Sequence, residues 1–466
     1  MIPVNLLNDN RRIHFIGIGG IGMCGLAEYF VKNGYNVSGS DIAGSHITER
    51  LEKLGAGVFI GHDEKHITSD IETVVYTSAV KQDNPEYVKA FELGLRLIKR
   101  AAMLGEIVNQ KFLIAIAGTH GKTTTTAMIG KLLADAGLDP LVFVGGNTPL
   151  FNGSTYRPGK GKYAVVEADE YDRSFLTLKP DIGVITNVDE DHLDIYKDLN
   201  DIKHTFLRFC SLAKQDGKII YFGDDANIND FINDSGKNKI SYGFGEQNYL
   251  KIKDCRVEGD KISYSIMNSV SLYENIDLNL FGRHNVLNSA ACFAVSKALE
   301  IDFEVFKKSM AEFKTVDRRL QLKYDNNDIK IYDDYAHHPK EIASSLNGLR
   351  EFYGSKRLVL IFQPHLYSRT KDLYMDFAKE LALADEVVLL EIYPAREKPM
   401  EGITSELIYN ELKKNKVSAI YIKENEKAAD YLMQISVKGD VIVFQGAGDI
   451  TNICDEFIKA LVLKGN

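Results

Sequence analysis

One segment of the chain has the residue types and spacing of a loop that holds nucleotide phosphates. Gly118-Thr-His-Gly-Lys-Thr-Thr-Thr follows the apolar run 112–117 and precedes the helical pattern 127–136. In this order, backbone N–H groups at the helix start can bind phosphate oxygens, Lys122 can neutralise their charge and the Thr123 hydroxyl can ligate Mg²⁺. The loop is shorter than the GxxxxGK[ST] pattern, so the alternative is a glycine-rich helix start with a solvated lysine. The strand–loop–helix order favours binding of ATP or GTP.

A second glycine-rich loop, Gly17-Ile-Gly-Gly-Ile-Gly22, also follows an apolar strand and opens a helix. Asp41 follows this motif at about the separation in sequence at which a carboxylate binds a ribose hydroxyl in dinucleotide-binding folds. Alone, this motif indicates a dinucleotide such as NAD. A nucleotide sugar fits equally well, because any pyrophosphate can bind at such a helix N-terminus. With two phosphate loops in one chain, we interpret one as activating and the other as holding a substrate.

Carboxylates follow the next predicted strand. In Tyr163-Ala-Val-Val-Glu, Glu167 ends an apolar run, where it can reach a metal bound over a neighbouring phosphate loop. Mg²⁺ prefers carboxylates, hydroxyls and water, so Thr123 and Glu167 form a plausible ligand pair. Solvated loop charges are expected for the other acids of this loop, which are Asp169, Glu170 and Asp172.

A further acidic segment contains a histidine. Asn187-Val-Asp-Glu-Asp-His-Leu-Asp follows the apolar run 181–186, again at the carboxyl end of a predicted parallel strand. His192 could be a metal ligand or an orienting group, whereas a surface turn would explain the acids equally well. Both interpretations stay open on the sequence alone.

A later helix start carries two asparagines. In Phe281-Gly-Arg-His-Asn-Val-Leu-Asn, the amide of Asn288 or Asn285 can pair with the edge of adenine. Capping of the helix by Asn285 is the simpler alternative, and the two roles are compatible.

Two polar segments follow strands in the last third of the chain. They are Asp334-Tyr-Ala-His-His-Pro and Phe362-Gln-Pro-His-Leu-Tyr-Ser-Arg-Thr. Arg369 could clamp a carboxylate by two parallel hydrogen bonds, and His337 or His338 could order a phosphate or an amine. For either histidine alone, packing or capping is the safer interpretation.

The elements that must position these residues alternate between strands and helices. This alternation predicts an α/β fold with parallel sheets and helices on their faces. Strands are expected at 13–18, 36–39, 73–77, 112–117, 163–166, 181–186, 330–332, 357–362, 386–392 and 441–444, and helices at 21–32, 127–136 and 282–299. Alternating polar and apolar residues at 240–280 predict antiparallel strands added to the middle sheet. We expect three domains, at 1–105, 106–314 and 315–466.

Composition excludes several classes of protein. The 466 residues carry a formal net charge of −9, which gives no basic field for a nucleic acid. The five cysteines are scattered and contain no CxxC pair, so reduced thiols in cytosol fit best. The start of the chain lacks the pattern of a secretory signal, and no run of about 18 apolar residues occurs, so we expect a cytoplasmic protein without membrane insertion.

Taken together, seven segments resemble the Mur ligase family, in order and over nearly the whole chain. They are 17–22, 118–125, 167–174, 187–194, 281–289, 334–339 and 362–370. The GIGGIGM start, the GTHGKTTT loop and the FQPH-x-Y-x-RT segment are most similar to the alanine-adding members of that family.

The resemblance implies a Rossmann-like domain that binds a UDP-sugar, a central P-loop ATPase-type domain and a C-terminal Rossmann-like domain that closes over an amino acid. It implies a reaction of peptidoglycan precursor synthesis. ATP would phosphorylate the lactyl carboxylate of UDP-N-acetylmuramate, and the amine of L-alanine would then attack the acyl phosphate. The implied cofactors are ATP and Mg²⁺, with Mn²⁺ as a substitute, and the chain is expected to be a monomer or weak homodimer.

The resemblance also implies roles for individual residues. The residues implied in catalysis are Lys122, Glu167, His192, His337 and Arg369, and those in metal binding are Thr123, Glu167 and His192. The residues implied in ATP binding are Gly118, Thr119, His120, Gly121, Lys122, Thr123, Thr124, Asn288 and Asp334. The residues implied in UDP-sugar binding are Gly17, Gly19, Gly20, Gly22, Asp41 and Ser78.

Two features depart from the family pattern. Many relatives have arginine directly after the FQPH histidine, whereas this chain has Leu366, which removes one possible clamp for the amino-acid carboxylate. Several related ligases use a carbamylated lysine near the metal. Neither Lys197 nor Lys203 is assigned that role here.

Three rival functions remain. A nucleotide-gated binding protein without catalysis would bind ATP with no substrate-dependent phosphate release, and the number of candidate catalytic residues argues against it. A recycling ligase of the same architecture would attach a whole peptide to UDP-N-acetylmuramate and would need an open amino-acid pocket. An NAD-dependent dehydrogenase would use the first glycine-rich loop, but it would leave Lys122, Glu167 and the third domain unexplained.

Overall fold

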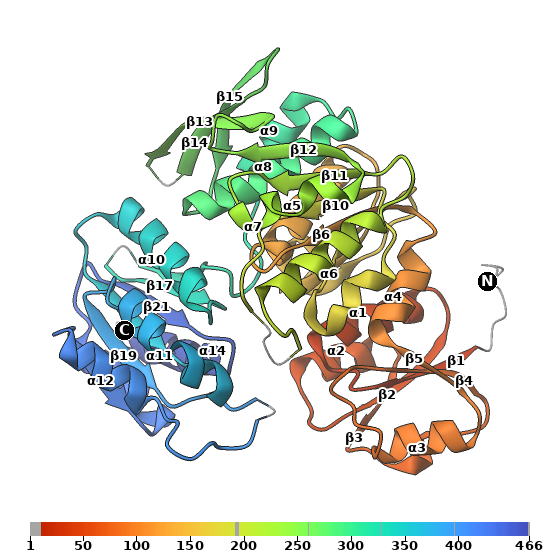
Figure 1. Ribbon diagram of the computed structural model, residues 1–466. Coiled ribbons are helices and arrows are strands. Elements are labelled where there is room, and N and C mark those ends of the chain that lie inside the picture. Colours follow the sequence, from red (N-terminus) through yellow and green to blue (C-terminus); the bar gives the residue numbers. More distant parts are fainter. Residues whose placement is uncertain (1–10, 192–194, 260, 327, 396, 465–466) are drawn as a thin grey trace. The chain divides into compact units, whose positions relative to one another are not determined.

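The computed structural model describes residues 11–191, 195–259, 261–326, 328–395 and 397–464. Its strands form three sheets, and helices connect them (Figure 1). The predicted α/β class with three successive sheets is confirmed.

The first sheet has five parallel strands in the order β3-β2-β1-β4-β5. Its strands are β1 (Arg12–Ile16), β2 (Asn36–Asp41), β3 (Gly57–Ile60), β4 (Ile71–Tyr76) and β5 (Arg96–Lys99). Its helices are α1 (Ile21–Lys32), α2 (His46–Lys53), α3 (Pro85–Glu92) and α4 (Arg100–Val108). The predicted strand 13–18 ends earlier, at Ile16, because the chain turns at Gly17 with φ 83°.

The second sheet has ten strands in the order β15-β14-β13-β12-β11-β10-β6-β9-β7-β8. Its strands are β6 (Phe112–Ala117), β7 (Leu141–Thr148), β8 (Ser154–Arg157), β9 (Tyr163–Glu167), β10 (Ile182–Ile185), β11 (Lys218–Phe222), β12 (Asn238–Gly243), β13 (Leu250–Glu258), β14 (Lys261–Met267) and β15 (Leu272–Leu278). The strands predicted in 240–280 are present, but the antiparallel prediction is wrong for β12 and β13. The last two residues of β12 pair in parallel with the first two of β13, Tyr242 with Leu250 and Gly243 with Lys251.

The helices of this middle region are α5 (Lys122–Asp135), α6 (Leu199–Ser211), α7 (Ala226–Asn229), α8 (Arg283–Ala298) and α9 (Phe303–Ala311). Buried aliphatic residues fill β6 and β10, as expected for strands covered on both faces. The first two sheets share one hydrophobic core, in which Tyr29 of α1 packs 6.0 Å from Phe143 of β7. The chain forms two compact units, and residues 11–191, 195–253, 265–274 and 287–310 belong to the first.

The second unit, residues 254–264, 275–286 and 311–464, contains the third sheet. The sheet order is β16-β17-β21-β18-β19-β20, and only β16 is antiparallel to its neighbour. The strands are β16 (Gln321–Asp325), β17 (Lys330–Asp334), β18 (Leu358–Phe362), β19 (Glu386–Leu390), β20 (Ala419–Ile422) and β21 (Val441–Gln445). The helices are α10 (Pro339–Tyr353), α11 (Tyr367–Leu381), α12 (Glu406–Lys414), α13 (Ala428–Ile435) and α14 (Ile450–Lys464).

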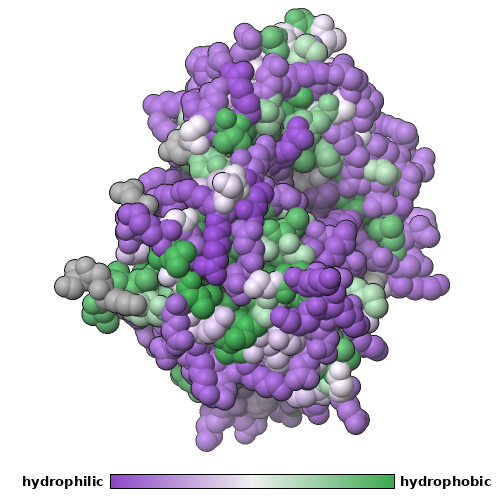
Figure 2. Space-filling view, turned by 90° about the vertical axis from the view of Figure 1, so that its left-hand side faces the viewer, coloured by the Kyte–Doolittle hydropathy of each residue, from purple (hydrophilic) through white to green (hydrophobic). Residues whose placement is uncertain are grey.

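The face of the molecule in Figure 2 is mainly hydrophilic. On the face in Figure 2, hydrophobic residues are scattered in small groups among hydrophilic ones. Within the described residues, every helix is too short or too polar to cross a membrane.

Candidate active site

The phosphate loop starts at the carboxyl end of β6. This strand lies between β10 and β9 and is parallel to both, so the three strands end at one edge of the sheet. Polar residues that follow them therefore converge around Gly118–Gly121, as the sequence predicted.

Two glycines give the loop its shape. Gly118 has φ 137°, and a Cβ atom there would lie 2.0 Å from the Thr186 hydroxyl oxygen. Gly121 has φ 82° and lies against Asn288, whose Oδ1 would be 2.6 Å from an added Cβ. Both positions therefore require glycine, and buried Asn288 is placed beside the loop.

The start of α5 is arranged to receive an anion. Its N-cap residue, Gly121, provides no side-chain cap for the helix. The first N–H groups of a helix have no partner within the helix, and the helix dipole favours negative charge there. Lys122, Thr123 and Thr124 form this first turn, so these three predicted ATP-binding residues lie together at the helix start.

Asn187 braces the loop from the neighbouring strand. Its Oδ1 accepts a 2.8 Å hydrogen bond from the His120 backbone N–H, and its Nδ2 donates to the His120 carbonyl at 2.9 Å. The Asn187 carbonyl also accepts from the Thr119 N–H at 3.1 Å. Asn187 was not predicted as a site residue, although its position at the start of the acidic segment was the available signal.

Lys122 forms a buried ion pair with Glu170. Its Nζ donates to Glu170 at 2.9 Å and to the Gly118 and Thr119 carbonyls at 2.5 and 3.1 Å. Burial disfavours both charges. Burial raises the pKa of Glu170, although the positive charge of Lys122 acts in the opposite direction. Burial alone would lower the pKa of Lys122, but the neighbouring carboxylates outweigh it and raise this pKa. The prediction that Glu170 is a solvated loop charge is wrong, because the Glu170 side chain is only 4% exposed.

The residues after Glu170 hold it in place. The Tyr196 hydroxyl donates to the Glu170 carbonyl at 2.5 Å, and the Arg173 guanidinium lies 4.9 Å from the centre of the Tyr196 ring. Arg173 also makes two hydrogen bonds to Asp201 at 2.7 and 3.0 Å. Arg173 has φ 53°, so this loop has a strained backbone at the edge of the site.

The predicted metal ligands Thr123 and Glu167 lie together. The Thr123 hydroxyl donates to Glu167 Oε1 at 3.2 Å, while Oε2 accepts the Gly145 N–H at 2.8 Å. A hydroxyl and a carboxylate beside a phosphate-binding helix start are a donor set that suits Mg²⁺. The third predicted ligand, His192, lies outside the described residues, and the described residues alone contain no cluster of three metal-ligating side chains.

The first glycine-rich loop lies at the carboxyl end of β1. The Gly17 N–H donates to the Ser40 carbonyl at 2.8 Å, and the Gly19 N–H donates to Asp41 Oδ2 at 2.8 Å. Gly22 packs against Arg100, which lies 3.2 Å from where a Cβ would be. One oxygen of Asp41 therefore shapes the loop.

Ser78, the last of the residues predicted to bind the UDP-sugar, contacts the loop after β9. Its hydroxyl donates to Asp172 Oδ2 at 2.5 Å, and the same oxygen accepts from Lys99 at 2.9 Å. These bonds lower the pKa of Asp172. Asp172 is thus a paired residue rather than a solvated loop charge, and Ser78 and Lys99 connect the first sheet to the loop after Glu167.

In the second unit, Asp334 ends β17 and is buried. It accepts hydrogen bonds from the Ser345 hydroxyl at 2.6 Å, from Gln445 at 3.0 Å and from the Leu320 N–H at 3.2 Å. Burial raises its pKa above the ordinary aspartate value. These internal partners favour a role in holding β17, α10 and β21 together, and the contact with an ATP ribose stays a prediction.

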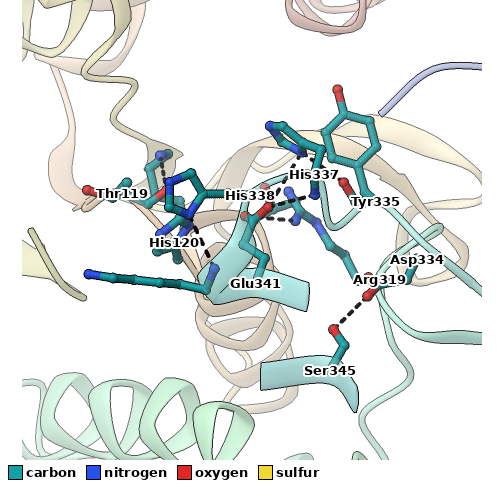
Figure 3. A network of polar contacts seen from close by, with 12 residues as sticks. Thr119, His120, Arg319, Asp334, Tyr335, His337, His338, Glu341 and Ser345 are labelled. Atoms are coloured by element: carbon teal, nitrogen blue, oxygen red, sulfur yellow. Dashed lines mark hydrogen bonds and ion pairs between the residues drawn. The ribbon is translucent and has the colours of Figure 1, made fainter. Parts of the chain in front are cut away.

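His337 lies in a polar network with Glu341 (Figure 3). Its backbone N–H donates to Glu341 at 3.1 Å, and its Nδ1 lies 2.9 Å from the Tyr335 carbonyl. Arg319 approaches the other Glu341 oxygen at 4.0 Å. His338 instead caps α10, which is the alternative that the sequence left open for one of the two histidines.

His365 connects the two residues predicted to bind the amino acid. Its ring lies 5.7 Å from the His337 ring, its Nδ1 is 3.4 Å from Arg369, and it stacks on Tyr393 at 5.9 Å. Leu366, at the N-cap of α11, has φ 73°. His337 and Arg369 are therefore brought together, and His365 and Tyr393 join them although neither was predicted.

Near-full-length relatives identify the family. The chain is 41% identical to the UDP-N-acetylmuramate–L-alanine ligase of Clostridium tetani, over 96% of this chain and 98% of the relative. It is 43% identical to the protein of the same name from Geotalea uraniireducens, over 97% and 98%. The chain belongs to the Mur ligase family. Three family models match this Mur ligase in order: the Mur ligase family catalytic domain at 12–112, the middle domain at 116–296 and the glutamate ligase domain at 318–448.

Solved structures agree with this Mur ligase fold. The crystal structure of UDP-N-acetylmuramate–alanine ligase from Thermotoga maritima has a TM-score of 0.85 and 30% identity, over 97% of this chain and 99% of that one. A murein peptide ligase from Psychrobacter arcticus has a TM-score of 0.72 at 24% identity, over 97% and 98%, which shows the shared fold alone. The domain limits near 105 and 314 stay our proposal.

Proposed function

We propose that this Mur ligase joins L-alanine to the lactyl carboxylate of UDP-N-acetylmuramate in peptidoglycan precursor synthesis. The observation that carries the proposal is the identity of 41–43% to proteins named for that reaction, over nearly the whole of both chains. The likeness of 30% over the full length of the Thermotoga maritima structure supports it independently.

The reaction needs an activated carboxylate, because a carboxylate in water does not condense with an amine. Transfer of the γ-phosphoryl group of ATP to the lactyl carboxylate gives an acyl phosphate and ADP. Attack by the amine of L-alanine then forms the amide and releases phosphate. Both steps balance without an oxidant or reductant.

Lys122 and the start of α5 are proposed to hold the ATP phosphates. The uncapped helix start offers N–H donors, and the Lys122 ammonium is fixed by Glu170 at 2.9 Å beside them. Positive charge placed in advance where negative charge develops is the main catalytic device of phosphoryl transfer. Asn288 lies against Gly121 and is proposed to bind the adenine of ATP.

Mg²⁺ would neutralise phosphate charge, and Mn²⁺ could substitute for it. Thr123 and Glu167 are the described residues proposed to hold the ion, and His192 is proposed as the third. Glu167 is oriented by the Gly145 N–H, so its remaining oxygen is directed to the Thr123 side of the loop.

The UDP-sugar is proposed to bind at the first glycine-rich loop. Gly17, Gly19, Gly20 and Gly22 allow close approach of a pyrophosphate to the start of α1, with Asp41 and Ser78 at the margin.

In the second unit, Arg369 is proposed to bind the carboxylate of L-alanine, and His337 to orient its amine. We place the enzyme in the cytoplasm as a monomer or weak homodimer.

An isotope experiment tests the acyl-phosphate route directly. UDP-N-acetylmuramate labelled with ¹⁸O in the lactyl carboxylate should transfer one label to phosphate in each turnover with ATP and L-alanine. Unlabelled phosphate would exclude the acyl phosphate. Tight binding of NADH to the first loop would instead favour the dehydrogenase alternative.

A further inference from the structure

A cavity lies at the amino-terminal edge of the first sheet. Its volume is about 490 Å³, which is within the range of small-molecule sites. Residues at the starts of β1, β4 and β5 line it, together with residues of α1 and α4. The glycine-rich loop leaves the opposite end of β1, so this cavity is separate from the proposed UDP-sugar site.

The wall is aromatic and apolar. The rings of Phe30 and Tyr35 meet edge to face at 4.8 Å, and those of Tyr29 and Phe30 meet at 5.2 Å. Met103 and Ile107 of α4 also line the cavity. Aromatic edges and flexible aliphatic side chains favour a flat apolar ligand.

The rim carries more positive than negative charge. Its charged residues are Arg11, Arg12, Arg96 and Lys111, with Glu72 and Glu106. The contact between Arg11 Nε and Glu72 is long, at 3.9 Å, and the Arg11 side chain is 29% exposed. Arg11 can therefore turn to a carboxylate, sulfonate or phosphate on a bound molecule.

Packed side chains connect the cavity to Glu167, the carboxylate that is proposed to bind the metal. Tyr29 lies 6.0 Å from the rings of both Phe143 in β7 and Tyr156 in β8. Two residues beyond Phe143, Gly145 donates the hydrogen bond that orients Glu167. A ligand that displaces Tyr29 would therefore shift β7 and the position of Glu167.

We propose that this cavity is an effector site for a planar aromatic anion, and that occupancy changes the use of ATP through Tyr29 and β7. The effect on ATP rests on the proposed function, whereas binding does not. The coupling requires that the ligand bind more tightly to the protein with β7 in one position than to the protein with β7 in another.

The test uses the full-length protein and 8-anilinonaphthalene-1-sulfonate, an aromatic sulfonate with a planar naphthalene ring, whose fluorescence reports binding. Ile107→Trp fills the cavity and Arg11→Gln removes the rim charge. Arg256→Gln is the matched control, because Arg256 is 61% exposed, is paired with Glu258 and is not among the residues that line the cavity. Phe143→Leu weakens the connection without altering the lining.

We expect saturable binding of one probe per chain, which persists at saturating UDP-N-acetylmuramate and at saturating ATP, with an affinity that ATP changes by about the factor by which the probe changes the affinity for ATP. Ile107→Trp should weaken binding about tenfold, Arg11→Gln by about threefold or more, and Arg256→Gln not at all. The probe should change KM for ATP about threefold or more in the wild type, and Phe143→Leu should bind the probe but lose this change.

Unchanged probe binding in a folded Ile107→Trp variant, or complete competitive displacement of the probe by either substrate, would overturn the site. Should Ile107→Trp not fold, Gln110→Trp at an exposed lining position gives the same test. Binding with no change in KM would overturn the coupling. Because probe binding needs no turnover, an inactive enzyme would contradict the proposed function while leaving the site testable.

Discussion

Glu170 and Lys122 meet through a hydrogen bond of 2.9 Å, and both side chains are largely buried, at 4% and 12% exposed. The two residues are 48 positions apart in the sequence, so the pair fixes the loop after β9 to the phosphate loop after β6. Removal of one partner would leave the other charge buried and unpaired, which costs about 3–5 kcal/mol in other proteins.

Lys122→Ala should abolish turnover while UDP-sugar binding survives. The lysine is proposed to neutralise phosphate charge, and the glycine-rich loop that is proposed to bind the sugar belongs to a different sheet. Calorimetric titration with UDP-N-acetylmuramate, alongside phosphate release, measures both properties. Loss of both in a folded variant would contradict the two-site account.

Glu170→Gln should lower kcat by about tenfold or more, because Lys122 loses the carboxylate that fixes its position. Asp135→Asn is the control, since Asp135 pairs with Lys131 further along the same helix at a more exposed position. Steady-state kinetics and thermal unfolding of both variants separate an effect on turnover from an effect on stability. Equal kcat values in the two variants would remove Glu170 from the account.

Gly118→Ala should destabilise the phosphate loop and weaken ATP binding. An alanine there would have both an unfavourable φ of 137° and a Cβ atom 2.0 Å from Thr186. Gly44→Ala is the control, because an added Cβ meets nothing nearer than 3.9 Å. Nucleotide binding and the thermal midpoint should change only in the first variant.

Leu366→Arg should lower KM for L-alanine with little change in kcat. Position 366 precedes α11, close to His365 and Arg369, so an arginine there restores a second possible clamp for the carboxylate. Leu366→Met controls for removal of the leucine. Similar KM values in the two variants would show that the clamp does not act here.

The thermal stability of Glu86→Gln should differ from that of the wild type in a pH-dependent way. Burial would raise the pKa of Glu86, but contacts with His14, Ser40 and His66 outweigh it and lower the value to about 2. Because the folded-state pKa lies below the ordinary value of 4.5, the ionised Glu86 stabilises the fold above that pH, and this contribution is lost as the pH falls towards 2.

The measurement is the thermal midpoint of wild type and Glu86→Gln between pH 7 and pH 3. The wild type should be more stable by about 3 kcal/mol or less at pH 7, and the difference should narrow below about pH 4.5. A difference that stays constant over this range would mean that Glu86 does not titrate as described.

Local sequence patterns predicted the elements that hold most of the site. The predicted bounds 21–32 and 112–117 agree with α1 and β6, because continuous apolar character and flanking glycines mark both elements. The strands β7 and β8 were not predicted, although the run 141–144 is apolar and buried; only the second half of β7, from Gly145, has the composition of a loop.

The side-chain partners were harder to predict than the strands. Glu170 stands in an acidic loop that looks solvated, and its burial depends on Lys122 and Tyr196 from distant segments. His365 and Tyr393 come together through a bridge between the segments after β18 and β19. Such contacts depend on strand order, which the sequence pattern does not specify.

Phosphate release from ATP in the presence of UDP-N-acetylmuramate tests the central claim most directly. The comparison covers L-alanine, other amino acids, the tripeptide of a recycling ligase and no acceptor, and the product is identified by mass. The account predicts that L-alanine gives the highest kcat/KM and that the product is UDP-N-acetylmuramoyl-L-alanine. Preference for the tripeptide would favour the recycling ligase, and release that does not depend on the sugar would contradict both assignments.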